Sequence, residues 1–505
     1  MVNILSYLEN SAKAFPQKIA FADDETEITF SGLKNAAMAI ASRILELTNS
    51  ERNVPVVVLL KKSVNCITAF MGITYAADFY TPLDSTSPQA RLLKIKDTLR
   101  PRLIITTKEL LPAAQSLGFC EEQIILIEDA VSHSIDSGKI EAALSGKIDT
   151  DPLYILFTSG STGTPKGVTI CHRSVIDYIE WVCNTFHFDE NTRFGNQAPF
   201  YFDNSILDIY STLKTGATTY IIPEKLFIFP VKLIEYLNEK KINTIFWVPS
   251  ALIYAANSKI LSKQIPQYLT KILFCGEVMP NKQLNIWRRA LPDALYANLY
   301  GPTEITDVCA YYMVDREMSD DEPLPIGFPC ANTDIIVLNE KNEAVKGSEI
   351  GELCVRGTSL SLGYYNNPEK TRDAFVQNPL NPYYPELIYR TGDLVKYNER
   401  HELIYLCRRD FQIKHMGHRI EIGEIETAAL SLPNMENGCI VYDEQANKIV
   451  LFYQSETLDD AAVLVGMRDL LPKYMLPNRL IKLDRMPMNA NGKIDRVTLK
   501  ESLKK

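Results

Sequence analysis

The chain has 505 residues, of which 46% are hydrophobic and 23% charged, as is usual for a globular protein. A chain of this length is too long for one hydrophobic core, which predicts a large body and a smaller additional domain. The formal net charge of -9 offers no basic surface, so nucleic-acid binding is not expected.

The beginning of the chain carries no recognisable targeting signal. Residues 1–9 have no basic region before an apolar stretch, and the apolar run Val56 to Leu60 is far too short to cross a bilayer. We therefore expect a cytoplasmic protein without membrane insertion. The ten cysteines show no C-x-x-C spacing, which favours reduced core residues over disulfides or a zinc site.

Strands and helices alternate along the first 275 residues. The chain begins with an amphipathic helix from Asn3, and a helix over 31–47 has Ser31 as a candidate N-cap. Buried strands are predicted at 19–22, 56–60, 103–106, 123–127, 154–157, 168–170, 218–222, 244–248 and 271–274, and further helices at 63–77, 206–213 and 231–240. This alternation is typical of α/β layers with largely parallel sheets.

The pattern changes in the last third of the chain. Short alternating strands at 335–338, 352–355 and 403–406, separated by Gly-rich turns, predict a β-rich subdomain. The residues after Arg409 predict a small α+β unit. We therefore predict an α/β fold with a large N-terminal domain, residues 1–409, and a small mobile C-terminal domain, residues 410–505.

The segment from Thr158 to Gly167 is rich in glycine and hydroxyl side chains and connects two predicted strands. Glycine lets backbone N–H groups approach an anion, serine and threonine add neutral donors, and Lys166 supplies a positive charge. The segment therefore predicts a phosphate-binding loop. It is not a Walker A loop, because no Gly-Lys-Ser/Thr opens a helix. A flexible surface loop is the alternative.

Two polar stretches lie next to predicted regular elements. Asp203-Asn204-Ser205 precedes a helix, and its side chains either cap that helix or bind a ligand. The stretch from Tyr300 to Glu304 is predicted to be a tight turn that presents a hydroxyl and a carboxylate together. A carboxylate beside phosphates is useful chiefly as a Mg²⁺ ligand.

Three more stretches carry candidate residues. Tyr389 to Asp393 is predicted to end a strand in a turn, where Asp393 would accept ribose hydroxyls or simply be an exposed turn residue. Arg408 to Lys414 is followed closely by Gly417-His418-Arg419-Ile420-Glu421. Asn491-Gly492-Lys493 has the signature of a hairpin turn, with Lys493 either solvated or catalytic.

In their order and spacing these stretches resemble the core motifs of the adenylate-forming superfamily, over nearly the whole chain. Within that superfamily the chain resembles amino-acid adenylation domains of nonribosomal peptide synthetases and the stand-alone D-alanine:carrier protein ligases. Residues 196–200, 207–210 and 273–278 look closest to the latter. The resemblance implies ATP and Mg²⁺ as cofactors, and an amino acid and a phosphopantetheinyl carrier protein as partners.

The resemblance also implies roles for individual residues. Lys493 would stabilise charge between substrate carboxylate and α phosphate, Thr303 would contact that phosphate, Glu304 would bind Mg²⁺, and Asp410 would be the hinge of a rotating C-terminal domain. The loop would hold the β and γ phosphates through Thr158, Ser159, Gly160, Ser161, Thr162, Gly163 and Lys166. The rest of the nucleotide would contact Gly276, Glu277, Asn298, Leu299, Tyr300, Gly301, Asp393 and Arg408.

The implied substrate pocket contains Asp203, Asn204, Leu207, Trp247, Leu273, Cys275, Leu299, Asp307 and Val308. In amino-acid-activating members the residue matching Asp203 pairs with the substrate α-ammonium. Asp307 departs from the small apolar pocket of D-alanine ligases, and a buried carboxylate is costly unless paired. We therefore hypothesise that Asp307 meets a polar or cationic substrate side chain, whose length Trp247 would limit. Trp247 would otherwise be a plain core residue.

Two departures from the family pattern lie away from the implied chemistry. Cys407 stands where the family usually has glycine before the arginine, and Tyr75-Ala76-Ala77 stands where Lys-Ala-Gly is common.

Two other functions remain open. One is an acid:CoA ligase, which generally lacks the residue matching Asp203, and the other is a non-catalytic nucleotide-binding relative. Joint retention of Lys166, Glu304, Asp393 and Lys493 favours an enzyme, since a binding module does not need the lysine on the moving domain.

Overall fold

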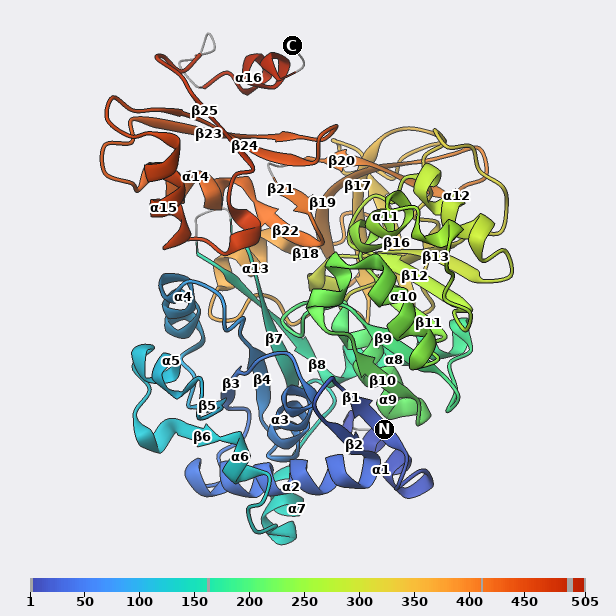
Figure 1. Ribbon diagram of the computed structural model, residues 1–505, viewed down its shortest axis with the longest axis vertical. Coiled ribbons are helices and arrows are strands. Elements are labelled where there is room, and N and C mark those ends of the chain that lie inside the picture. The colour runs from blue at the N-terminus through green and yellow to red at the C-terminus, as the bar shows by residue number, and fades with distance from the viewer. Residues whose placement is uncertain (1–2, 161–163, 410–411, 488–493, 504–505) are drawn as a thin grey trace. The chain divides into compact units, whose positions relative to one another are not determined.

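The computed structural model describes residues 3–160, 164–409, 412–487 and 494–503 (Figure 1). The chain divides into two compact units. The first comprises Met1–Ser85, Arg100–Leu156 and Val168–Arg409, and the second comprises Thr86–Leu99, Phe157–Gly167 and Asp410–Lys505. The predicted phosphate loop thus belongs to the same unit as the C-terminal segment.

A six-stranded sheet with order β6-β5-β3-β4-β7-β8 forms one layer of the first unit. Its strands are β3 (Pro55–Leu59), β4 (Phe79–Pro82), β5 (Leu103–Thr106), β6 (Ile124–Leu126), β7 (Pro152–Thr158) and β8 (Lys166–Cys171). The pairs of β3 with β4 and β5, of β4 with β7 and of β5 with β6 are parallel. The strands are nearly continuous apolar runs, as strands buried on both faces require.

A nine-stranded sheet with order β15-β14-β13-β12-β11-β9-β10-β1-β2 forms a second layer. Its strands are β1 (Ile19–Ala22), β2 (Glu27–Thr29), β9 (Arg193–Asn196), β10 (Thr218–Ile221), β11 (Thr244–Trp247), β12 (Lys271–Cys275), β13 (Leu295–Tyr300), β14 (Ala310–Met313) and β15 (Phe328–Pro329). The strands from β13 through β1 pair in parallel. These two sheets confirm the predicted α/β class with largely parallel sheets.

The predicted β-rich part is an antiparallel sheet of β16 (Thr333–Leu338), β17 (Gly351–Gly357), β19 (Leu387–Tyr397), β18 (Phe375–Gln377) and β20 (Leu403–Arg408). The turn predicted at 389–393 is wrong, because these residues lie inside β19. A register irregularity against β17 and a φ of 74° at Gly392 deform the strand there without ending it.

Helices cover the sheets of the first unit and include α1 (Leu5–Ala14), α2 (Phe30–Leu47), α3 (Val64–Tyr75), α5 (Leu111–Ser116), α6 (Ile127–Ala130), α7 (Ser137–Leu144), α8 (His172–Phe186), α9 (Ser205–Thr215), α10 (Pro230–Glu239), α11 (Pro249–Asn257), α12 (Asn281–Ala290) and α13 (Pro368–Ala374). The N-cap predicted for α2 is wrong. Thr29, not Ser31, caps this helix, since its side chain accepts the N–H of Gly32 at 3.1 Å.

The second unit contains helix α4 (Gln89–Leu99) and the C-terminal elements. These are β21 (Gln412–His415), β22 (His418–Glu421), α14 (Ile422–Leu430), β23 (Asn437–Asp443), β24 (Lys448–Gln454), α15 (Asp460–Arg468), β25 (Arg479–Lys482) and α16 (Arg496–Ser502). The strands β21 and β22 form a hairpin, and β23, β24 and β25 form a small sheet. A core around Ile425, Leu451 and Val463 holds α14 and α15 together with this sheet.

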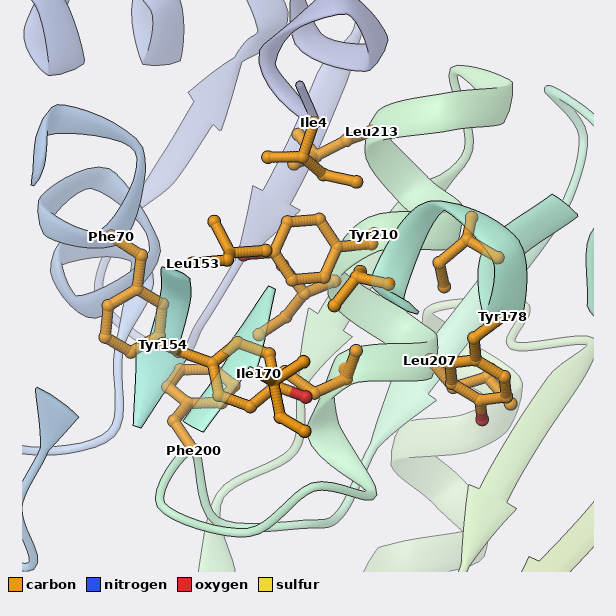
Figure 2. Packing of buried hydrophobic residues seen from close by; sticks show 14 of the residues in the cluster. Ile4, Phe70, Leu153, Tyr154, Ile170, Tyr178, Phe200, Leu207, Tyr210 and Leu213 are labelled. Atoms are coloured by element: carbon orange, nitrogen blue, oxygen red, sulfur yellow. The ribbon is translucent and has the colours of Figure 1, made fainter. Parts of the chain in front are cut away.

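The nine-stranded sheet separates two hydrophobic clusters, because neighbouring residues of a strand face opposite sides. The first cluster includes Phe246, Leu273 and Leu299 and extends to the six-stranded sheet (Figure 2). The second cluster includes Trp247 and Phe274.

All ten cysteines are free, and eight of them are buried, as predicted; Cys120 and Cys407 are exposed. Within the described ranges, no helix is long and apolar enough to cross a membrane.

Candidate functional site

The predicted phosphate loop connects the end of β7 to the start of β8. Gly160 is required for its shape, because a Cβ atom there would lie 1.9 Å from the carbonyl oxygen of Thr164. The Oγ1 atom of Thr158 is buried without a hydrogen-bond partner among the described atoms. Ser161, Thr162 and Gly163, predicted to bind phosphate, lie outside the described residues. The Thr164 carbonyl thus packs directly against Gly160.

Two carboxylates of the C-terminal segment contact the donors of this loop. The backbone N–H of Gly160 donates to Oε2 of Glu424 at 3.2 Å, and Lys166 Nζ lies 3.5 Å from Oε1 of Glu421. Sequence reasoning did not select Glu424, because nothing local relates it to a loop more than 250 residues earlier. The donor set predicted to bind phosphate therefore already binds anions.

Glu424 is also paired with Arg91 of α4, and both side chains are buried. Burial raises the pKa of Glu424, and the Arg91 guanidinium and the Gly160 N–H act against that increase. Ser159 holds the loop to the same segment, since its Oγ donates to the carbonyl of Arg419 at 2.8 Å and accepts the N–H of Glu421 at 3.0 Å. The loop, α4 and the start of α14 thus form one hydrogen-bonded cluster.

Asp393 of β19 is the centre of a buried polar group in the first unit. Arg408, at the end of β20, donates to Oδ1 of Asp393 at 2.9 Å, and the hydroxyl of Tyr300 donates to Oδ2. Burial raises the pKa of Tyr300 far above its usual range, with the Asp393 charge as the second cause. The pairing of β19 with β20 places Asp393 opposite Arg408. The structure therefore brings together three residues predicted to bind the nucleotide.

Glu304 lies in the short 3₁₀ turn Thr303–Ile305 that follows β13. Its side chain is fully buried, and Oε1 accepts the hydroxyl of Tyr364 at 2.7 Å. No group of three or more His, Cys, Asp or Glu suited to a metal occurs among the described residues. Mg²⁺ usually takes only one or two protein carboxylates and keeps several waters, so Glu304 fits this role as a single ligand.

The other predicted nucleotide contacts lie at the ends of β12 and β13. Asn298 donates to the carbonyl of Pro325 at 2.8 Å, and Glu277 accepts the N–H of Ser250 at 2.9 Å. Gly276 has a φ of 100°, a conformation that favours glycine. Gly301 allows a close approach, because a Cβ atom there would lie 2.3 Å from the carbonyl oxygen of Asp307.

Most predicted pocket residues gather in the first cluster. Leu207, Leu273, Cys275, Leu299 and Val308 are all buried there. Asp203 and Asn204 stand at the start of α9, where Oδ1 of Asp203 accepts the N–H of Asn204 at 3.1 Å. The side chain of Asn204, the N-cap residue of α9, makes no capping hydrogen bond.

The structure separates Trp247 from these residues. It lies in the second cluster, and its indole N–H donates to the carbonyl of Gly195 at 2.7 Å. Phe246 instead is in register with Leu273 and faces the first cluster. Side chains alternate between the two faces along a strand, and residues in register on paired strands share a face. Pairing the predicted strand at 244–248 with Leu273 could therefore have identified Phe246 from the sequence.

Asp307 is buried in the first unit and contacts a residue that sequence reasoning missed. Its Oδ2 accepts the hydroxyl of Tyr178 of α8 at 2.7 Å. Lys493 and Asp410, the predicted catalytic lysine and hinge, lie outside the described residues.

Residues 8–365 match the family model described as AMP-binding enzyme. The chain belongs to this family of adenylate-forming ligases, whose members use ATP and typically Mg²⁺. The match covers the loop, the Glu304 turn and every predicted pocket residue.

Curated relatives include proteins that this chain spans almost entirely and longer ones that it spans only in part. The chain is 30% identical over 502 residues to the L-proline--[L-prolyl-carrier protein] ligase of Pseudomonas fluorescens, covering 97% of each chain. It is 29% identical to the D-alanine--D-alanyl carrier protein ligase of Lacticaseibacillus casei, covering 98% of each. It is 30% identical to tyrocidine synthase 1 of Brevibacillus parabrevis, of which it spans only 45%.

Solved structures share the fold. The Vibrio cholerae adenylation domain AlmE, in complex with glycyl-adenosine-5'-phosphate, superposes with a TM-score of 0.85 at 22% identity, covering 100% of this chain and 98% of that one. A fused adenylation and PCP di-domain from Klebsiella oxytoca gives a TM-score of 0.82 at 20% identity, covering 95% and 94%. The overall architecture is therefore that of adenylation domains.

Proposed function

We propose that the protein activates a small amino acid as its aminoacyl-adenylate, releasing pyrophosphate, and transfers the aminoacyl group to the phosphopantetheine thiol of a carrier protein. The observation that carries the proposal is the similarity, over 97% or more of both chains, to two carrier-protein ligases that act on an amino acid. The substrate is D-alanine or another small amino acid, including a polar or cationic one.

The residues of the first unit suit the nucleotide part of this reaction. Asp393, fixed by Arg408 and Tyr300, is a buried carboxylate that would accept ribose hydroxyls. Glu304 would hold Mg²⁺, which neutralises phosphate charge as pyrophosphate leaves. Thr303 on the same turn would donate to the α phosphate.

The residues of the second unit suit the phosphates and the reacting centre. Gly160 and Lys166 provide the backbone donor and the charge for the β and γ phosphates. Lys493 would stabilise the negative charge that develops between the substrate carboxylate and the α phosphate. We propose Asp410 as the hinge about which the C-terminal domain, residues 410–505, moves between the two half-reactions.

The substrate part of the proposal rests on Asp203 and Asp307. Asp203 would pair with the α-ammonium group, and Asp307 would meet a donor on the substrate side chain. Phe246, rather than Trp247, would limit the length of that side chain, because it faces the same cluster as Leu273.

The test is amino-acid-dependent exchange of labelled pyrophosphate into ATP, with L- and D-amino acids, β-amino acids and simple carboxylic acids as substrates. We expect exchange with at least one small amino acid, and a loss of 100-fold or more for Asp203→Ala, on the order of that for other charge-pairing groups in enzyme sites. Tyr296→Phe, a buried change in the second cluster, is the control. Exchange with carboxylic acids that lack an amino group would instead support an acid:CoA ligase.

A further inference from the structure

Tyr178 lies where three separate segments predicted to form the substrate pocket converge. It projects from α8 into the first cluster, which also contains Leu207, and Figure 2 draws both side chains there. Its hydroxyl donates to Oδ2 of Asp307 at 2.7 Å. Burial raises the pKa of Tyr178 far above its usual range, and Asp307 and then Cys275 add to this increase. The phenol therefore stays protonated and always donates to Asp307.

The backbone at Asp307 is held in an unfavourable conformation. Thr306 and Asp307 are consecutive residues with φ of 60° and 75°, in the left-handed region that side chains other than glycine rarely adopt. Gly301 makes room for this arrangement, because any Cβ there would collide with the Asp307 carbonyl. Strain of this kind persists only where the surroundings enforce it, and it clusters at functional sites. The strained backbone at Thr306 and Asp307 thus places the Asp307 carboxylate within hydrogen-bond distance of the Tyr178 hydroxyl.

Asp203 and Asp307, the two carboxylates predicted to bind substrate, both raise the pKa of the same neighbouring residue, Tyr154. Tyr154 of β7 is fully buried, and its hydroxyl has no hydrogen-bond partner among the described atoms. Burial raises its pKa, and Asp203 and Asp307 are both among the further causes. The half-buried Asp203 and the buried Asp307 therefore both lie close enough to act on the Tyr154 phenol, although more than 100 residues separate them in the chain.

We propose that Tyr178 is a specificity-determining positioning residue, which holds the Asp307 carboxylate oriented so that the site favours a small amino acid with a hydrogen-bond donor on its side chain. This inference rests on the proposed function. A hydroxyl or short ammonium group on the substrate adds a donor to the buried carboxylate, whereas a methyl group adds none. Sites built to bond a substrate donor discriminate strongly against analogues that lack it.

The test compares wild type, Tyr178→Phe and Tyr296→Phe by pyrophosphate exchange with serine, threonine, 2,3-diaminopropionate and alanine, each in both chiral forms. Tyr296 is the matched control, because its buried phenol donates to the carbonyl of Trp287 at 2.8 Å in the second cluster. We expect Tyr178→Phe to lower the ratio of kcat/KM for the best donor-bearing substrate over alanine by tenfold or more, mainly through KM. The control should keep the wild-type ratio.

A pH profile separates positioning from a merely structural role. Tyr178→Phe removes a hydrogen bond that favours the charged form of the carboxylate it reaches. In Tyr178→Phe the acid-side loss of activity with the donor-bearing substrate should move to higher pH, while the profile with alanine should not move. Asp307→Asn, which keeps an acceptor for Tyr178, should also lower the substrate ratio even if Tyr178→Phe folds poorly.

The outcomes distinguish the two levels of the proposal. An unchanged ratio in folded Tyr178→Phe and in Asp307→Asn overturns the role of Tyr178. Wild type that prefers alanine over every donor-bearing substrate also overturns this role but leaves amino-acid activation intact. Wild type that activates no amino acid overturns the proposed function itself.

Discussion

Among the described residues, each unit contains a carboxylate–arginine pair with both side chains buried, Asp393 with Arg408 and Glu424 with Arg91, and each carboxylate accepts from a different kind of third group. In the first unit Asp393 is bonded to Arg408 and to the hydroxyl of Tyr300. In the second unit Glu424 is paired with Arg91 and accepts the backbone N–H of Gly160. The first pair is thus completed by a side chain, whereas the second is completed by a donor of the phosphate loop.

The Asp393 carboxylate is therefore an acceptor that is already held in place, whereas the donors of the loop already contact carboxylates. A hydroxyl that binds Asp393 adds to donors that already fix the carboxylate. A phosphate that binds the loop must replace Glu424 at Gly160 and Glu421 near Lys166. The residues of the first unit that we propose to bind the nucleotide are therefore organised in advance, while phosphate binding at the loop would exchange one anion for another.

Removal of Arg408 should have the largest effect on stability. Arg408→Ala leaves Asp393 as a buried charge without its cation, and such changes cost about 3 to 5 kcal/mol. The control is Arg173→Ala, which breaks an exposed pair with Asp149 and should cost less than about 1 kcal/mol. Urea unfolding measures both. Equal losses of unfolding free energy in the two variants would mean that the buried pair of Asp393 and Arg408 stabilises the fold no more than an exposed ion pair does.

Acid should destabilise both units, through the fully buried His172 in the first unit and the half-buried His418 in the second. The pKa of His172, fully buried in α8, is lowered to about 3 by burial, and that of His418 in β22 is lowered to about 3 for the same reason. The unfolded chain binds a proton near pH 6.5 and the folded chain does not, so stability falls as pH drops below 6.5. For His172 the loss between pH 7.5 and pH 5 is about 2 kcal/mol.

The difference between wild type and His172→Asn isolates this contribution. Asparagine stays neutral and still offers an acceptor for the N–H of Ile4, which His172 Nδ1 accepts at 3.3 Å. Unfolding free energies at the two pH values should therefore converge in the variant. Identical pH dependence in both proteins would show that His172 is not held neutral by the fold.

Local sequence patterns predicted the parallel layers well, because a buried strand needs a continuous apolar run. The strands at 19–22 and 103–106 agree with β1 and β5 at both ends. The face of the sheet to which each side chain points was harder to predict. Trp247 and Phe246 are both apolar and, as neighbours in a strand, face opposite sides of the sheet, but only the pairing of β11 with β12 shows that Phe246 is the one that shares a face with Leu273.

Features that depend on distant partners had no local signal. Residues 389–393 contain turn-forming types, but the pairing with β17 keeps them in a strand. Tyr178 gives no hint of its bond to Asp307, since 129 residues separate them. The same holds for Glu424 at the phosphate loop. Most of the candidate donors and acceptors could therefore be identified from the sequence, whereas their hydrogen-bond partners could be assigned only from the folded structure.

The smallest expected effect tests the exchange of anions at the loop directly. Glu424→Gln keeps the shape of the side chain but removes the negative charge that contacts the Gly160 N–H. Pyrophosphate should then bind about threefold to tenfold more tightly than to wild type, because it no longer displaces a charged competitor, and tenfold corresponds to about 1.4 kcal/mol. Isothermal titration with Mg²⁺-pyrophosphate measures the change.

The matched control is Glu426→Gln, one half-turn further along α14. Glu426 pairs with Arg496 at 2.6 Å and accepts the N–H of Ile440, so its change removes a charge and an ion pair from the same helix without touching the loop. Its pyrophosphate affinity should equal that of wild type. If Glu424→Gln binds pyrophosphate no more tightly than this control, Glu424 anchors the loop without competing for it, and the contrast between the two carboxylate–arginine pairs disappears.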